Sequence, residues 1–170
     1  MNIRVAQVRV VPEKGKLDVN HARLMHVLDE IAPHEPDVVV TSECYLDGYV
    51  VTEEAVTAES LLDYAVDPVD SPYVDEVSAW AAVNNAWLIF GCMRAAPEGA
   101  YNSALIFDRG GELAGTYDKT HLQKHDLKFR PGNALPVFDS DFGPFGVMIC
   151  ADRRWPETVR TRALQGARVI

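Results

Sequence analysis

The sequence has few of the features needed to bind an anionic polymer, cross a membrane or form a disulfide framework. Its 170 residues include 16 basic and 25 acidic side chains, so the formal net charge is −9 at pH 7. A negative surface repels phosphate backbones and anionic lipids. The sequence also has no apolar run long enough to span a bilayer and no N-terminal signal pattern. We therefore expect a cytoplasmic protein that binds neither nucleic acid nor membrane.

Cysteine and histidine are also scarce. The odd number of cysteines and their wide spacing argue against disulfides. The cysteines are Cys44, Cys92 and Cys150. The five histidines contain no His-x-x-x-His pair and no zinc-binding spacing with cysteine. We expect neither a metal nor a cofactor.

The composition is that of a globular α/β protein. Hydrophobic residues make up 48% of the chain and aromatic residues 9%, which is enough for a packed core. No internal repeat or low-complexity linker divides the sequence, so we predict one domain over residues 1–170. Apolar periodicity predicts a strand over 3–10, a helix over 18–31 and a strand over 37–41. Together these form a right-handed, parallel βαβ unit.

The rest of the chain predicts a mixed sheet. Ser71 and Pro72 are the N-cap and first residue of a helix that runs to about residue 84, and a strand follows over 86–93. Two hairpins are then expected. The first joins 102–107 to 112–117 through Arg109-Gly110-Gly111, with a glycine at positive φ, and the second joins 137–138 to 145–149. A final helix begins at Pro156 and ends near Gly166.

A candidate nucleophile lies in the segment 146–157, which reads GVMICADRRWPE. An apolar strand is predicted to stop at Cys150, and a helix follows a few residues later. Such a turn exposes the side chain at its apex and directs backbone N–H groups to the same point. A lone cysteine, however, is more often a small buried hydrophobic residue. The assignment of Cys150 therefore depends on other residues.

Two further segments supply a carboxylate and an ammonium group. The segment 38–49 reads VVVTSECYLDGY, and its apolar run leads directly to Glu43. The segment 115–122 reads GTYDKTHL and contains Lys119. A thiol, a base and a cation together are typical of acyl transfer through a thioester. The alternative is that Glu43 and Lys119 form a buried ion pair with no chemical role. Cys44 has no helix after it, so we expect it to pack beside the pocket.

On these three segments the chain resembles the nitrilase, or carbon-nitrogen hydrolase, superfamily. Lys-Thr-His-Leu and Cys-x-Asp-Arg-Arg-Trp-Pro-Glu are the specific motifs, and the order of glutamate, lysine and cysteine is the family's. The resemblance implies a four-layer αββα sandwich with mixed β-sheets. It also implies that Cys150 is the nucleophile and that Glu43 is the general base and later the acid. Lys119 and the N–H of Ala151 would stabilise the oxyanion.

The residues after the nucleophile narrow the expected substrate. True nitrilases usually carry Cys-Trp-Glu, whereas this chain has Cys150-Ala151-Asp152, which favours a small-molecule amide or carbamoyl compound. The string from Asp152 to Glu157 is most similar to enzymes that hydrolyse N-carbamoyl amino acids. Arg153 and Arg154 either stabilise the turn by salt bridges, form a subunit contact, or bind a substrate carboxylate. We expect Trp155 to pack under the turn. The resemblance also implies a homo-oligomer.

The sequence departs from the family pattern at two points. Ser42 replaces the proline that often precedes the first glutamate. Amidase-type members usually place a second glutamate about six residues before the Pro-Gly that is Pro131-Gly132 in this chain. That position is His125, and Asp126 is next to it. Either residue could take over the positioning of substrate.

The last four residues, 167–170, read as the opening of another strand. The family resemblance implies further strands and helices beyond them, so we expect a domain that is incomplete at its C-terminal end, with apolar faces open to water. Two alternatives to hydrolysis stay open. One is a non-catalytic interaction module with the same fold. The other is a different reaction of the same thiol, either acyl transfer to an amine or nitrile hydrolysis.

Overall fold

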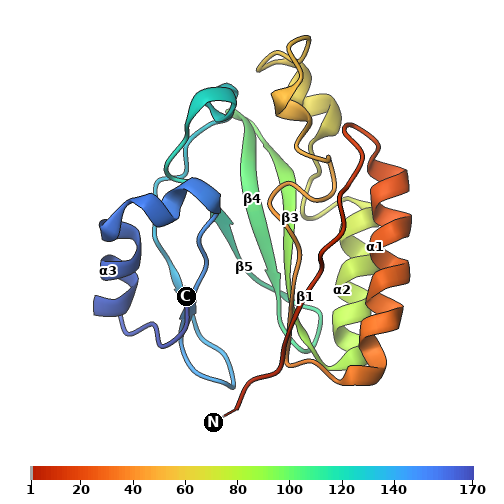
Figure 1. Cartoon of the computed structure of the whole chain (residues 1–170), viewed down its shortest axis with the longest axis vertical. Helices are drawn as coiled ribbons and strands as arrows, with labels where there is room; N and C mark the ends of the chain where they lie inside the picture. Colours follow the sequence, from red (N-terminus) through yellow and green to blue (C-terminus); the bar gives the residue numbers. More distant parts are fainter. Residues whose placement is uncertain (1) are drawn as a thin grey trace.

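A five-stranded mixed sheet forms the centre of the structure, a computed structural model that describes residues 2–170 (Figure 1). The strand order is β1-β2-β3-β4-β5. β1 and β2 pair in parallel, as do β2 and β3, whereas β4 is antiparallel to both of its neighbours. The strands are β1 (Val5–Gln7), β2 (Val38–Val40), β3 (Trp87–Ala96), β4 (Gly99–Phe107) and β5 (Leu113–Asp118). The predicted βαβ unit and mixed sheet are confirmed.

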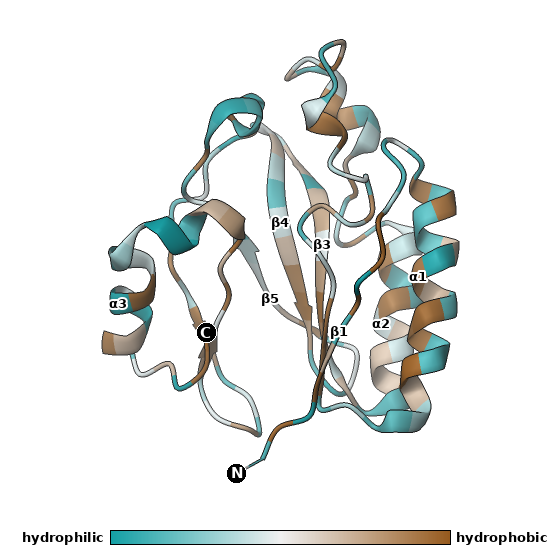
Figure 2. Ribbon diagram, in the orientation of Figure 1, coloured by the Kyte–Doolittle hydropathy of each residue, from teal (hydrophilic) through white to brown (hydrophobic). Residues whose placement is uncertain are grey.

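Two helices, α1 (Leu17–Ile31) and α2 (Pro72–Asn84), cover one side of this sheet. Leu24 and Leu28 lie one helical turn apart on α1 and are fully buried in the core beneath the helices. Figure 2 shows hydrophobic residues along β3 and β4. The prediction for α2 is confirmed in its bounds. Ser71, however, makes no side-chain capping hydrogen bond, so only its extended backbone fits the expected N-cap role.

A second, smaller sheet lies on the other side of the large sheet. It pairs β6 (Val137–Phe138) with β7 (Phe145–Gly146), and Val169 adds a parallel bridge to Phe145. The predicted opening of a strand at the end of the chain is therefore confirmed. Helix α3 (Pro156–Leu164) lies outside this second sheet. The four layers are those of the predicted αββα sandwich.

Several strand boundaries differ from the prediction, and β1 covers only Val5–Gln7 of the predicted 3–10. β3 and β4 extend to Ala96 and back from Gly99, so a tight turn at Pro97 and Glu98 joins them as a hairpin that the sequence pattern did not indicate. The predicted glycine at positive φ in the next hairpin is confirmed as Gly111, at +79°. β7 ends at Gly146, well before the thiol. The residue that would pair next on the facing strand is Pro136, which has no N–H to donate.

Short 3₁₀ helices occupy several of the connections. They are η1 (Ala32–His34), η2 (Val50–Thr52), η3 (Ser60–Tyr64), η4 (Lys124–Lys128) and η5 (Cys150–Arg154). Residues of η2 and η3 pack with Phe129 and Met93 in a small core of their own. None of the helices in residues 2–170 is both long and apolar enough to cross a membrane.

An apolar cavity of about 340 Å³ opens between the edge of the large sheet and the second sheet. Its lining includes Val38, Phe145 and Val147. At its margin, Val5, Val169 and Ile170 are 59%, 43% and 40% exposed. Apolar side chains thus lie open to water here.

Candidate active site

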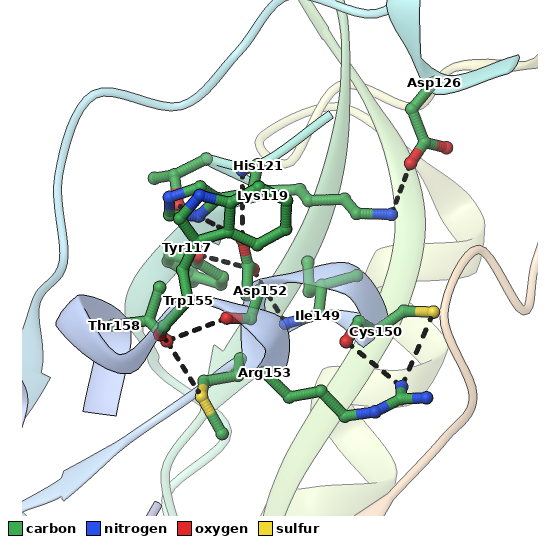
Figure 3. A network of polar contacts seen from close by, with 12 residues as sticks. Tyr117, Lys119, His121, Asp126, Ile149, Cys150, Asp152, Arg153, Trp155 and Thr158 are labelled. Carbon is green, nitrogen blue, oxygen red and sulfur yellow. Dashed lines mark hydrogen bonds and ion pairs between the residues drawn. The ribbon is translucent and has the colours of Figure 1, made fainter. Parts of the chain in front are cut away.

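Three charged side chains from different parts of the chain meet above the end of the large sheet. Glu43 lies in the turn after β2, Lys119 directly follows β5, and Asp126 lies in η4. The Lys119 Nζ is 2.6 Å from Glu43 Oε1 and 2.5 Å from Asp126 Oδ2. Lys119 and Asp126 are almost completely buried. Figure 3 shows the lysine side chain extended toward Asp126.

The position of Glu43 is set by the close approach of its turn to β3 and by a hydrogen bond from one side-chain amide. A Cβ on Gly91 of β3 would lie 2.1 Å from the carbonyl oxygen of Ser42, so only glycine lets the turn pass this close to the sheet. Asn102 of β4 is buried, and its Nδ2 donates to Glu43 Oε1 at 2.7 Å. Its carbonyl oxygen accepts from the N–H of Lys119 at 2.9 Å. Asn102 is not among the residues predicted from the sequence, although a polar residue inside an apolar strand is a signal that could have identified it.

The surroundings of Lys119 favour its charged form. Burial opposes the charge, but hydrogen bonds to Asp126 and Glu43 and the negative charges of both outweigh burial and raise the pKa of the lysine. Asp126 also accepts a hydrogen bond from the Tyr49 hydroxyl at 2.6 Å. Burial, followed by this bond, raises the pKa of Tyr49. His125 is exposed. Of the two candidates for the missing second glutamate, the structure therefore brings only Asp126 to the cluster.

Cys150 is the first residue of η5 and is exposed, whereas Cys44 and Cys92 are buried. Its φ is +42°, a left-handed conformation that is unusual for a residue with a side chain. Cys150 and Glu43 line the same small cavity of about 100 Å³. Burial, followed by the negative charge of Glu43, raises the pKa of the thiol, while Lys119 and Arg153 act in the opposite direction. The thiol thus lies beside the Glu43 side chain, which is placed to accept its proton.

Asp152 organises the turn that carries the thiol. Its buried carboxylate accepts from the Tyr117 hydroxyl at 2.6 Å, from Thr120 Oγ1 at 3.1 Å, and from the N–H groups of His121 and Ile149 at 3.0 Å each (Figure 3). The His121 Nδ1 also lies 3.0 Å from Oδ1. Burial opposes the negative charge, but these hydrogen bonds lower the pKa of Asp152.

The residues around Asp152 depart in part from expectation. Arg153 donates to the carbonyl oxygen of Cys150 at 3.1 Å and lies 3.9 Å from its Sγ. Arg154 donates to Gln123 at 2.9 Å. Within residues 2–170 neither Arg153 nor Arg154 forms an ion pair, so the structure does not show the salt-bridge alternative, and both side chains form hydrogen bonds instead. Trp155 does not pack under the turn. It stacks on the His121 ring, with 4.8 Å between the ring centroids, and this position leaves it 41% exposed. Ala151 is buried directly after the thiol.

In the part of the chain that the structure describes, no three His, Cys, Asp or Glu side chains are grouped to hold a metal ion. Cys150 and Glu43 line one cavity, and the Lys119 ammonium lies 2.6 Å from Glu43. Such a thiol, carboxyl group and ammonium can transfer a proton, attack a carbonyl carbon and stabilise an oxyanion.

Known proteins are similar to this chain in sequence and in fold. A nitrilase of Pyrococcus abyssi is 29% identical over 170 residues, which are 99% of this chain and 63% of the relative. A citrullinase of Francisella tularensis is 27% identical over 99% of this chain and 60% of its own length. The crystal structure of Saccharomyces cerevisiae Nit3, a member of branch 10 of the nitrilase superfamily, matches 97% of this chain and 61% of its own with a TM-score of 0.83 and 26% identity. The chain thus spans about three fifths of the length of these proteins.

The family model of carbon-nitrogen hydrolases matches residues 3–170, which is nearly the whole sequence. The chain belongs to the carbon-nitrogen hydrolase family.

Proposed function

We propose that this chain carries the catalytic residues of a hydrolase that cleaves the C–N bond of an amide or N-carbamoyl compound through a thioester on Cys150. The observation that carries the proposal is the buried contact of Lys119 with Glu43, 2.6 Å long, beside the exposed thiol. An isolated structural ion pair would not need a strained, exposed cysteine at its side.

In the first half-reaction Glu43 accepts the proton of Cys150, and the thiolate attacks the carbonyl carbon. The ammonium of Lys119 and the N–H of Ala151 stabilise the oxyanion. The C–N bond then breaks, and the nitrogen leaves as ammonia or an amine with the proton that Glu43 returns. The product on the enzyme is a thioester of Cys150.

In the second half-reaction water replaces the amine. Glu43 removes a proton from the water, the hydroxide attacks the thioester carbon, and Lys119 stabilises the second oxyanion. Collapse releases the acid, and the proton on Glu43 returns to the thiolate of Cys150. Asp126 also binds the Lys119 ammonium, at 2.5 Å, and so keeps it in place for the oxyanion in both steps.

The substrate class is a proposal of its own. Arg153 is exposed and reaches to within 3.9 Å of the Cys150 Sγ, so its guanidinium can bind a carboxylate on a substrate whose carbonyl carbon lies at the thiol. Arg154 lies farther along the same turn. Similarity to a citrullinase supports a ureido carbon as one electrophile. An N-carbamoyl amino acid combines both features.

A second candidate function follows from the open apolar surface. Val5, Val169 and Ile170 surround the cavity between the sheets, and water contact there is unfavourable. A non-catalytic module would use this surface to associate with a second copy of the chain or with a partner. Sedimentation of the chain, combined with the activity assay below, separates this function from hydrolysis.

The test is ammonia release from primary amides, N-carbamoyl amino acids and nitriles, with Cys150→Ala and Cys92→Ala compared. Cys92 is buried in the core under the helices, so its replacement controls for the loss of a thiol. We expect release to disappear only in Cys150→Ala. Full activity of Cys150→Ala would refute the assignment of Cys150 as the nucleophile. A folded chain that releases no ammonia would support the non-catalytic module. Addition of hydroxylamine distinguishes acyl transfer from hydrolysis, because the thioester then yields a hydroxamate.

A further inference from the structure

Lys119 and Cys150 belong to different sheets, yet the proposed chemistry needs them at a constant separation. Lys119 follows β5 of the large sheet, and Cys150 follows the second sheet through residues 147–149. Strand pairing does not join these two segments in the described sheets. Side-chain contacts must hold them together.

One buried carboxylate makes that connection. Tyr117, Thr120 and His121 lie on both sides of Lys119 in the chain, and all three donate to Asp152. The N–H of Ile149, directly before the thiol, donates to the same carboxylate at 3.0 Å. The side chain of Asp152 is 0% exposed. It therefore joins the residues that flank the ammonium to the residue that precedes the thiol (Figure 3).

The turn at Cys150 also needs such support. A non-glycine residue at positive φ costs about 1–3 kcal/mol and persists only where neighbouring contacts impose it. Asp152 binds the backbone N–H on one side of Cys150, and its own carbonyl oxygen accepts from Thr158 Oγ1 of α3 at 2.9 Å. The turn is thus held at both of its ends.

A buried arginine holds the Tyr117 side chain in place. The guanidinium of Arg162, fully buried on α3, lies over the Tyr117 ring with 4.6 Å between its Cζ and the ring centroid. Its Nη1 donates to the carbonyl oxygen of Thr158 at 3.0 Å. Helix α3 therefore holds both Asp152 and its strongest donor.

We propose that Asp152 is a positioning residue that sets the place of the Lys119 ammonium relative to the Cys150 thiol. Its catalytic consequence rests on the proposed function, but the placement itself can be measured without a substrate. Because Cys150 is exposed and the other two cysteines are buried, alkylation by iodoacetamide reports on this thiol.

The first measurement is the alkylation rate of Cys150 against pH in the wild type and in Asp152→Asn. The charged groups that face the thiol are Glu43, Lys119 and Arg153, and the two cations favour the thiolate. Displacement of Lys119 should therefore move the profile to higher pH by about one unit, which lowers the rate at pH 8 about tenfold. Tyr117→Phe removes one donor and should shift the profile in the same direction by less.

The second measurement asks whether Asp152 acts through Lys119. In a background of Lys119→Met with Asp126→Asn, we expect Asp152→Asn to cause no further shift, since the displaced ammonium is already gone. A purely structural role predicts the same shift in both backgrounds. Asp141→Asn is the matched control. Asp141 also accepts hydrogen bonds, from the indole N–H of the buried Trp87 and from the Arg109 guanidinium, but it lies outside the active-site cluster. The alkylation profile of Asp141→Asn should therefore match that of the wild type.

A folded Asp152→Asn with the wild-type profile would overturn the proposal, as would an equal shift in the background without Lys119. If Asp152→Asn does not fold, the alkylation profile of Tyr117→Phe tests the proposal by the same criteria. When ammonia release is measured, we expect kcat to fall about 10²-fold with KM nearly unchanged. If the wild type releases no ammonia, the proposed function fails while the alkylation profiles still decide the role of Asp152.

Discussion

Replacement of Lys119 by methionine is expected to destabilise the fold much more than the same replacement at a surface lysine. Lys119 and Lys14 each place Nζ 2.6 Å from a glutamate oxygen, of Glu43 and Glu53 respectively. The side chains of the first pair are 1% and 18% exposed, and those of the second are 50% each. The two pairs thus share a contact distance and differ in burial.

The magnitude follows from what remains after the substitution. Glu43 and Asp126 both bind the Lys119 ammonium, so in Lys119→Met two carboxylates face each other without it. At a separation of about 4.5 Å and an effective dielectric constant of about 20, their repulsion is about 3–4 kcal/mol. Broken buried ion pairs cost about 3–5 kcal/mol. The exposed pair of Lys14 contributes less than about 1 kcal/mol.

The assay is urea unfolding at pH 7, followed by tryptophan fluorescence, of the wild type, Lys119→Met and Lys14→Met. A further Asp126→Asn substitution in Lys119→Met should recover stability, because it removes one of the two facing charges. Since the folded-state pKa of Lys119 is raised above 10.5, the stabilisation is complete below that pH and is lost as pH rises through the raised value. Equal losses in Lys119→Met and Lys14→Met would refute the reasoning.

Two further predictions concern residues near Glu43. Burial raises the pKa of Asp47 from 3.8 to about 7, so the folded state holds a proton that the unfolded state releases, and unfolding free energy should fall by up to about 4 kcal/mol between pH 4 and 7. In Asp47→Asn, the unfolding free energy measured by urea titration should depend less on pH. An unchanged pH dependence would contradict the raised pKa of Asp47. Gly91→Ala should cost about 1–3 kcal/mol and reduce ammonia release, because the new Cβ would lie 2.1 Å from the Ser42 oxygen in the turn that carries Glu43. Gly110→Ala, with only an aspartate oxygen at 3.3 Å, is the control, and equal effects would show that crowding at Gly91 is not the cause.

Local sequence patterns predicted most of the elements. Helix α1 was predicted because its apolar residues recur at helical spacing, and α2 because Pro72 is favoured in a first helical turn. The hairpin with Gly111 followed from residues that tolerate positive φ. The hairpin between β3 and β4 was missed, because Pro97-Glu98 has no glycine in the turn itself and the strands continue past the residues that look most apolar.

Residues of the candidate site could be predicted only where they belong to a recognisable sequence motif. Glu43, Lys119 and Cys150 stand in segments whose residue types indicate chemistry. The sequence does not choose between His125 and Asp126, because adjacent side chains in an irregular loop point in directions that depend on the fold. η4 turns Asp126 into the cluster and leaves His125 in solvent.

The sequence by itself determined the α/β class, the order of the elements and the choice of Glu43, Lys119 and Cys150 as candidate reactive residues, because each depends on neighbours in the chain. The tertiary structure decided which carboxylate joins Lys119, where β7 stops short of the thiol, and that Asp152 links the two sheets. These features depend on contacts between residues far apart in the sequence, such as Tyr117 with Asp152 at 2.6 Å, which only the packing of one sheet on the other brings together.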